Sequence, residues 1–245
     1  MVTMADLIHP TRVRLLNLLI EGPETLSSLA KSLELSKPEI SRHLARLRDY
    51  ALVERGDKTH QITNLGETIM SILSPLEFIV KHYEFFMVHQ IFDLPAFIIR
   101  NLDSLMKSEL LIGTGYIFSK MQEIQQTVKK EIKIAIDQPF PGNDSNPLDN
   151  IYFIVPVYAK DENLSLEALK KQAKYFEFRT LPIISYGFGI ADEKTGFIFF
   201  PGINKKIDYN YAFFVSDPLG IDFLSQLWDY YWKRSDFRVS SKIIE

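Results

Sequence analysis

Basic side chains gather in one short stretch of this chain. From Ser36 to Arg48 there are four basic residues, Lys37, Arg42, Arg46 and Arg48, against one acidic residue, Glu39. Arginine donates paired hydrogen bonds to phosphate oxygens and to the O6 and N7 atoms of guanine. The whole chain has a net charge of −3, but binding to a polyanion depends on the charge that faces it. The chemistry offered by this stretch is therefore nucleic-acid recognition.

A helix over Ser36–Tyr50 would position these arginines. Ser36 and Glu39 have the S-x-x-E spacing of a capping box, and a proline is tolerated in the first helical turn. One face of this helix is apolar, with Ile40, Leu44, Leu47 and Ala51, and the opposite face carries Pro38, Arg42, Ala45, Arg46 and Asp49. A small residue between two arginines lets a helix approach base edges. Ser41 and the helix N-terminus are suited to hold a phosphate.

Two amphipathic helices are expected before this one. The first begins near Pro10, where the missing N–H costs nothing, and ends at Gly22-Pro23. The second has an apolar stripe with the i, i+3, i+4, i+7 spacing, formed by Leu26, Leu29, Ala30 and Leu33. Two short helices joined by a tight turn are a helix-turn-helix, which places its second helix in the DNA major groove.

A basic hairpin is expected next, from Leu52 to Ile62, with a two-residue turn at Gly56-Asp57. Asn64 is expected to cap the following helix, with Glu67 three residues on. This order of elements predicts a winged helix-turn-helix that binds double-stranded DNA. The predicted DNA contacts are Ser36, Lys37, Pro38, Ser41, Arg42, Ala45 and Arg46 on the helix, and Arg55 and Lys58 on the wing. The alternative is that these basic residues form an ordinary solvated face.

Three stretches of the sequence resemble archaeal transcriptional regulators with an ArsR-like winged helix: HPTRVRLL, LSKPEISRHLARL and QITNLGETI. Beyond them, FFMVHQIFDLP and SELLIGTGYIFSKMQEI resemble the middle domain of regulators of the methanogenesis-regulator type, in which a histidine and a proline recur at the positions of His89 and Pro95. The resemblance persists to Trp232. It implies a homodimeric DNA-binding regulator with a C-terminal sensing domain. Metal sensors of the ArsR type commonly use a cysteine pair, and this chain has no cysteine.

An aromatic-rich helix is predicted over Pro75–Phe92, followed by further helices from Phe97 to Lys130 with one break at Gly113-Thr114-Gly115. Five aromatic residues make the first of these more apolar than a surface helix of a monomer should be. Two interpretations stay open: a dimer interface that spaces two winged helices, or a helix buried under the C-terminal domain.

The pattern changes after Glu131. Runs of β-branched and aromatic residues predict strands at 132–136, 151–158, 175–181, 183–190 and 196–200. Helices are predicted at Leu164–Lys174 and Leu219–Arg234, and a long loop at Gln138–Asn150. Strands mixed with helices predict one sheet with helices packed on it. This layout resembles half of a phospholipase D-like fold, but the His-x-Lys-x4-Asp motif of that family is absent.

Few residues of the C-terminal half are suited to chemistry. The sequence Tyr186-Gly187-Phe188-Gly189 would let a ligand approach the backbone between two aromatic rings, so Tyr186 and Phe188 are the predicted ligand contacts; glycines in a strand are equally typical of a bulge. All five histidines precede residue 90, which leaves this half without a histidine or cysteine nucleophile of its own. His82 and His89 lie two helical turns apart, too far for one metal ion, and no metal or cofactor is predicted.

The sequence thus predicts an α+β protein in three parts: a winged helix-turn-helix over 1–74, a helical linker and dimerisation region over 75–130, and an α/β sensing domain over 131–245. The expected function is a sequence-specific, homodimeric transcription regulator under the control of a small-molecule effector. An enzyme or a protein-interaction module with a fused winged helix is the alternative. A cytoplasmic location is expected, because cysteine, a signal peptide and a membrane span are all lacking.

Overall fold

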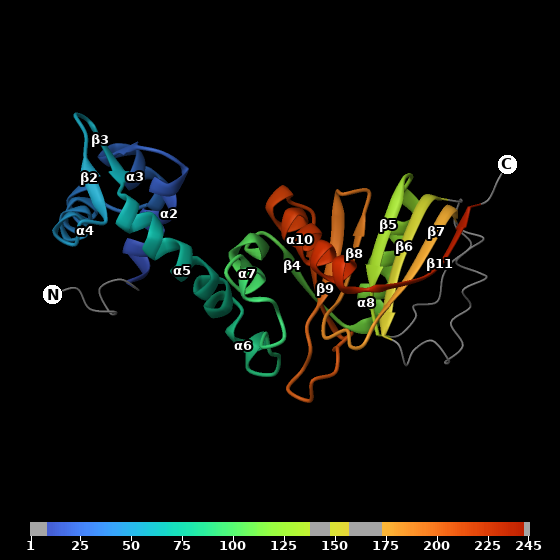
Figure 1. Cartoon of the computed structure of the whole chain (residues 1–245). Coiled ribbons are helices and arrows are strands. Elements are labelled where there is room, and N and C mark those ends of the chain that lie inside the picture. Colours follow the sequence, from blue (N-terminus) through green and yellow to red (C-terminus); the bar gives the residue numbers. More distant parts are fainter. Residues whose placement is uncertain (1–8, 138–147, 157–172, 243–245) are drawn as a thin grey trace. The chain divides into compact units, whose positions relative to one another are not determined.

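The computed structural model describes residues 9–137, 148–156 and 173–242 of the 245-residue chain. Contacts divide the chain into two compact units, Met1–Glu77 and Phe78–Glu245, which we call the first and the second unit. The first contains helices and a three-stranded sheet, and the second is built on an eight-stranded sheet (Figure 1). The predicted α+β class is therefore confirmed. The three-part division with boundaries at 74/75 and 130/131 stays a prediction.

The first unit is a helix-turn-helix followed by a hairpin. Its elements are α2 (Pro10–Glu21), β1 (Glu24–Thr25), α3 (Leu26–Leu33), α4 (Lys37–Asp49), β2 (Val53–Arg55), β3 (Thr59–Ile62) and the start of α5 (Asn64–Lys81). The strands form an antiparallel sheet in the order β1-β3-β2. The segment between α2 and α3 therefore pairs with the hairpin, which ties the wing to the helices. The three predicted helices are confirmed.

The core of the first unit is aliphatic. The helices supply side chains three or four positions apart, as the periodicity predicts, and burial of each leucine contributes about 2 kcal/mol. The buried members are Leu15, Leu16, Leu19, Leu29, Ala30, Leu33, Ile40, Leu44, Leu47, Leu52, Val53, Met70 and Leu73. Since α4 turns its apolar face into this core, its polar face is directed outward.

The turn of the wing differs from the prediction by one residue. Arg55 pairs with His60, and the N–H of Gly56 donates to the carbonyl of Thr59 at 2.9 Å. The two-residue turn is therefore Asp57-Lys58 rather than Gly56-Asp57. Strand register decides this, because the pairing of β2 with β3 leaves those two residues unpaired at the tip.

The cap of α5 is also displaced. Thr63 rather than Asn64 caps this helix: its Oγ1 accepts a hydrogen bond from the N–H of Gly66 at 3.1 Å. The same hydroxyl donates to the carbonyl of Ala51 at 2.6 Å. Thr63 thus satisfies a free N–H of the helix and at the same time ties the helix to the end of the α4 region. Gly66 permits this approach, because a Cβ there would overlap the carbonyl oxygen of Leu52.

The second unit contains the end of α5, four further helices and eight strands among its described residues. The helices are α6 (Tyr83–Phe86), α7 (Ala96–Ile99), α8 (Thr114–Thr127) and α10 (Pro218–Arg234), with the 3-10 helix η1 (Leu102–Leu105). The strands are β4 (Glu109–Ile112), β5 (Glu131–Ala135), β6 (Leu148–Pro156), β7 (Ala173–Leu181), β8 (Gly187–Ala191), β9 (Thr195–Phe199), β10 (Tyr211–Val215) and β11 (Asp236–Lys242). Their order is β11-β7-β6-β5-β8-β9-β10-β4.

The sheet of the second unit is mixed. β6 runs parallel to both neighbours, β5 and β7, and the other pairings are antiparallel. Helix α10 lies along one face of the sheet (Figure 1). Its residues Trp228 and Tyr231 pack on the ring of Phe188. Helix α8 packs on β4 and β10 and brings the ammonium group of Lys120 to 5.6 Å from the ring of Phe214.

The predicted aromatic helix Pro75–Phe92 is wrong as a single element. Pro75 lies inside α5, which ends at Lys81, and α6 begins at Tyr83 after a non-helical His82 (φ −111°, ψ 36°). The break follows from packing, because the His82 ring lies between aromatic neighbours, with centroids 4.9 Å from Phe78 and 5.0 Å from Phe213. Phe78 and Phe85 are buried in the core of the second unit. This favours the buried interpretation for those two side chains.

The helical prediction for Phe97–Lys130 is wrong at β4. That strand has one buried residue, Leu111, and pairs with β10, so its four residues carry no periodic signal of their own. Strands β10 and β11 were likewise not predicted. Of the predicted strand 183–190, only the part within β8 is a strand. Residues 148–150, which were predicted as loop, and residues 173–174, which were predicted as helix, are strand. The remainder of the predicted loop 138–150, of strand 151–158 and of helix 164–174 lies outside the described residues.

Candidate nucleic-acid interface

Helix α4 is fixed in place by its cap and by its apolar face. The Oγ of Ser36 accepts a hydrogen bond from the N–H of Glu39 at 3.4 Å, which is one half of the predicted capping box. Ile40, Leu44 and Leu47 are at most 1% exposed. Three buried side chains on one face and a capped first turn set the rotation of the helix about its axis. The arginines on the other face are thereby held outward.

The structure places the predicted contact residues of α4 on one accessible surface. Ser36, Lys37, Pro38, Ser41, Arg42 and Arg46 are exposed, and Ala45 is half-buried between the two arginines. A duplex can therefore reach this face without rearrangement of the first unit. On the wing, Arg55 and Lys58 are exposed as well. Lys58 lies in the turn and Arg55 ends β2.

A pocket of about 510 Å³ lies on the same face, and sequence reasoning missed part of its lining. Arg42, Ala45 and Arg46 line it together with Glu39, His43 and Asp49 of α4 and with Arg12 of α2. Arg12 is in the first turn of α2, far from α4 in the sequence. The contact depends on how α2 and α4 pack, and no spacing in the sequence indicates it.

His43 is the titratable group of this pocket with a perturbed pKa. Burial lowers the pKa of His43, and the neighbouring His9 and Arg12 lower it further. The ring centroid of His43 lies 4.9 Å from that of His9. The carboxylate of Glu39 acts in the opposite direction. The cause of the lowered pKa is thus partly a local excess of positive charge, which is the environment that a phosphate prefers.

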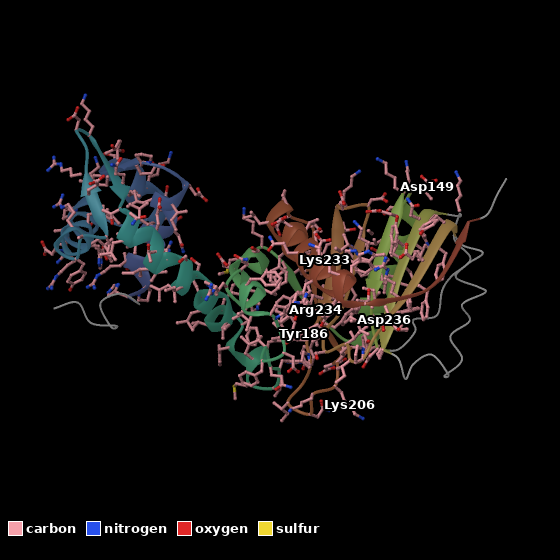
Figure 2. All side chains as sticks on the ribbon, in the orientation of Figure 1. Asp149, Tyr186, Lys206, Lys233, Arg234 and Asp236 are labelled. Carbon is pink, nitrogen blue, oxygen red and sulfur yellow. The ribbon has the colours of Figure 1, made fainter. Side chains whose placement is uncertain are left out.

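The predicted ligand contacts of the second unit are buried. Tyr186 is fully inside the unit (Figure 2), and its hydroxyl donates to the carbonyl of Gln90 at 3.2 Å. Phe188 is 1% exposed and packs on α10. The structure therefore gives both rings a packing role, and contact with a ligand stays a prediction for them.

His82 and His89, which were considered as metal ligands, contact other groups of the second unit. Nδ1 of His89 lies 2.8 Å from the carbonyl oxygen of Phe85, and Nε2 lies 3.3 Å from a carboxylate oxygen of Asp208. His82 packs between phenylalanine rings. Within the ranges that the structure describes, no group of three or more histidine, aspartate or glutamate side chains is arranged to hold a metal ion.

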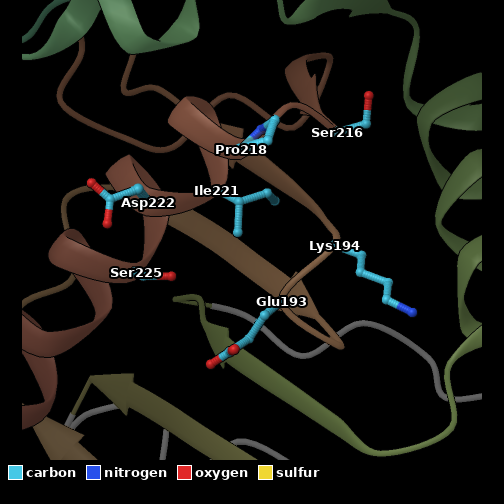
Figure 3. Close-up of a pocket in the computed structure, with 7 residues that line it drawn as sticks. All are labelled: Glu193, Lys194, Ser216, Pro218, Ile221, Asp222 and Ser225. Carbon is cyan, nitrogen blue, oxygen red and sulfur yellow. The ribbon is translucent and has the colours of Figure 1, made fainter.

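A second pocket, of about 470 Å³, lies at the start of α10 in the second unit (Figure 3). Its lining mixes acidic, basic, hydroxyl and apolar side chains: Glu193, Lys194, Ser216, Pro218, Ile221, Asp222 and Ser225. In Figure 3 the side chains of Lys194 and Ser216 point away from Asp222. The polar groups of this pocket therefore do not converge on one ligand atom, and they indicate no particular chemistry.

Comparison with known proteins finds a family to which part of the first unit is similar. Residues 9–55 match the model of the bacterial regulatory protein arsR family. An uncharacterized HTH-type transcriptional regulator of Methanocaldococcus jannaschii is 46% identical over 48 residues, which are 20% of this chain and 50% of that relative. The matched segment thus spans half the length of this curated relative and lies within a small part of the present chain.

Similar solved structures are remote in sequence. TrmBL2, an archaeal chromatin protein, is 14% identical with a TM-score of 0.40 over 94% of both chains. Nuc from Salmonella typhimurium, a phospholipase D family member, is 12% identical with a TM-score of 0.39 and covers 54% of this chain and 99% of its own. Similarity at this level carries no argument about activity. Among the described segments, no helix is long and apolar enough to cross a membrane.

The family match covers the helix-turn-helix of the first unit and part of its wing. The matched segment begins at His9, before α2, and ends at Arg55, the last residue of β2. It therefore includes both helices of the helix-turn-helix and half of the wing. The first unit of this chain therefore contains a helix-turn-helix that is similar to the arsR family over residues 9–55.

Proposed function

We propose that this protein is a DNA-binding transcription regulator that reads double-stranded DNA with α4 in the major groove. The observation that carries the proposal is the exposure of Arg42 and Arg46 on the face of α4 opposite its buried residues. The arsR-family match over 9–55 supports it independently. Two arginines one helical turn apart reach neighbouring base pairs or phosphates on the same side of the groove.

The other predicted contacts have supporting roles in this proposal. Ser36, Lys37, Pro38 and Ser41 surround the first turn of α4, where free N–H groups and the helix dipole favour a phosphate. Ala45 keeps the centre of the helix close to the base edges. Arg55 and Lys58 extend the contact to the minor groove or its phosphates, on the side of the hairpin.

The proposal is tested by the double substitution Arg42→Ala plus Arg46→Ala. Systematic selection of bound duplexes from a random pool defines a target for the wild-type protein, and fluorescence anisotropy then measures affinity across a salt series. The variant is expected to lose at least about thirtyfold in affinity, because each arginine contact discriminates by about 1–3 kcal/mol. The matched control is Arg100→Ala plus Lys107→Ala, two exposed basic residues of the second unit. Equal binding by both variants would refute the assignment.

We further propose that the protein acts as a homodimer through α5. Four apolar residues of this helix, Leu65, Ile69, Ile72 and Leu76, are spaced by four, three and four positions, as in the seam of a coiled coil. Leu65, Ile72 and Leu76 are 48%, 71% and 44% exposed. A stripe of large apolar side chains open to water fits a second copy of the same helix. Two copies would present two α4 helices to successive major grooves, about 34 Å apart.

The dimer is tested with two neighbouring substitutions that add the same charge. Ile72→Glu is expected to yield a monomer in analytical ultracentrifugation and to abolish preference for targets with two half-sites. Ser71→Glu lies outside the stripe and should leave a dimer. A wild-type protein that sediments as a monomer at micromolar concentration would refute the proposal.

Effector control belongs to the same proposal. We assign it to the second unit, whose size and separate core suit a sensing role, with Tyr186 and Phe188 as the predicted contacts. A ligand that binds one arrangement of the dimer more tightly would shift its DNA affinity by that difference. Thermal-shift screening of small metabolites against the full chain, followed by the DNA assay with each hit, tests this step. A hit that stabilises the protein without altering DNA affinity would count against it.

A further inference from the structure

The pocket on the DNA-facing side of the first unit includes two basic residues, Arg12 and His43, that the proposed groove contacts leave unused. It is formed where the first turn of α2 meets the face of α4 from Glu39 to Asp49, and its volume is about 510 Å³. Three arginines line it, Arg12, Arg42 and Arg46, against two carboxylates, Glu39 and Asp49. The first turn of α2 carries no acidic side chain. Both the arginines and the dipole of α2 therefore favour an anion at this place.

His43 is a further basic residue of this pocket. It lines the pocket beside Arg42 on α4 and packs its ring against His9, the residue that precedes α2. The groups that act on it are His9 and Arg12 from the α2 side and Glu39 and Arg42 from its own helix. A protonated His43 would add a further donor and a further positive charge facing the same space.

We propose that this pocket takes a phosphodiester group of the DNA backbone, held by Arg12 together with Arg42 and His43. This inference rests on the proposed DNA-binding function and adds α2 to the contact surface. Arg12 binds phosphate rather than a base edge, since it comes from the helix that does not enter the groove. Its contribution to affinity is therefore independent of the DNA sequence, whereas that of Arg46 depends on it.

The proposal also sets the direction of the pH dependence. The pKa of His43 in the free protein lies below 6.5, and a phosphate beside the ring would raise it in the complex. The complex then binds more protons than the free protein. The extra affinity is fully present below the pKa of the free protein and is lost as the pH rises through the pKa of the complex. DNA affinity is expected to fall from pH 5.5 to pH 8, by at most about tenfold per pH unit, the limit for one proton.

The first test is Arg12→Gln with Arg14→Gln as its control, because Arg14 is an exposed arginine on the same helix outside the pocket. Arg12→Gln should lower affinity about tenfold, the usual cost of one charged hydrogen bond, and equally for target and random duplexes. It should also reduce the slope of log affinity against log salt by about one. Arg14→Gln should change neither quantity.

Each outcome decides one statement. If the wild-type protein binds no duplex, the proposed function fails; if it binds and Arg12→Gln behaves like Arg14→Gln, the phosphate pocket alone is refuted. Should Arg12→Gln melt early by circular dichroism, Arg12→Lys replaces it: this variant keeps the salt slope and still loses affinity, because lysine cannot make the paired contact.

The second test is His43→Asn, which should remove the pH dependence of binding that the wild-type protein shows. His9→Asn is the matched control, since His9 contacts the His43 ring but does not line the pocket. Persistence of the pH dependence in His43→Asn, or its loss in His9→Asn alone, would overturn the role of His43.

Discussion

The core of the first unit is built from aliphatic side chains, whereas that of the second unit combines aliphatic side chains with many aromatic rings. Thirteen leucine, isoleucine, valine, alanine and methionine residues fill the first. The second contains phenylalanine, tyrosine and tryptophan rings at its centre, among them Phe78, Phe188, Phe200, Phe213 and Trp228. In the first unit the conspicuous polar residues are outside and available for contact. In the second unit the two predicted ligand contacts, Tyr186 and Phe188, are inside and pack on other rings, so a residue type typical of ligand sites is here used for packing.

The strongest test of this difference between the two cores is the removal of one buried aromatic ring. Phe213 is fully buried and its ring contacts those of Phe78, Phe85 and Phe200. Phe213→Ala is expected to destabilise the second unit by about 3–5 kcal/mol through lost burial and a cavity. Both tryptophans of the chain, Trp228 and Trp232, lie on α10, so their fluorescence in a denaturant titration reports this unit specifically.

The control for this variant is Phe92→Ala. Phe92 is 82% exposed, and its removal should cost less than about 0.5 kcal/mol. DNA affinity at low denaturant should survive Phe213→Ala, because the two cores share no residue. If the unfolding transition seen by tryptophan fluorescence and the loss of DNA binding occurred at the same denaturant concentration, the two units would unfold together.

In the first unit the largest effect at a single polar side chain is expected for Thr63→Ala. The substitution removes the cap of α5 and the hydrogen bond to Ala51, and should cost about 1–2 kcal/mol. Asn64→Ala should be nearly neutral. Thermal melts by circular dichroism compare the stability of the two variants. A larger loss of stability for Asn64→Ala would show that Asn64 caps α5, as the sequence predicts.

The substitution Tyr186→Phe tests the packing role of Tyr186. Burial raises the pKa of Tyr186, and its hydroxyl is satisfied by the Gln90 carbonyl. Loss of that hydrogen bond should lower stability by about 1 kcal/mol, as followed by tryptophan fluorescence. Unchanged stability, combined with a lost response to an effector, would instead favour a ligand contact.

The smallest effect concerns Tyr175, at the edge of the aromatic unit. The hydrogen bond to Glu177, 2.7 Å long, raises the pKa of Tyr175 to about 12. Since the folded-state pKa lies above the ordinary value of 10.0, the stabilisation is complete below pH 10 and is lost as the pH rises toward 12. Absorbance at the tyrosinate wavelength should include a late component from Tyr175 in the native protein, and Glu177→Gln should move that component toward lower pH. An identical titration curve in the variant would contradict the assigned cause.

Prediction succeeded where a short segment carries its own signal. α4 has a cap, a helical apolar period and charges on one face, and all three agree on its location. The fold class follows for the same reason, from helices at one end and strand-length runs at the other. Prediction failed where an element depends on a partner: β4 is a strand because β10 lies beside it, and Thr63 is the cap because Ala51 is near. Neither neighbour is visible in a local pattern.

What the sequence alone determined is the arginine face of α4, because one helix with a buried stripe must turn its other side to water. The tertiary structure decided which residues distant in the sequence join that face. It also decided which of the aromatic rings predicted as ligand contacts are buried. Arg12 enters the pocket and Tyr186 enters the core through the packing of elements far apart along the chain. Local periodicity is set by covalent geometry and is readable residue by residue, whereas such contacts depend on the whole set of packed surfaces at once.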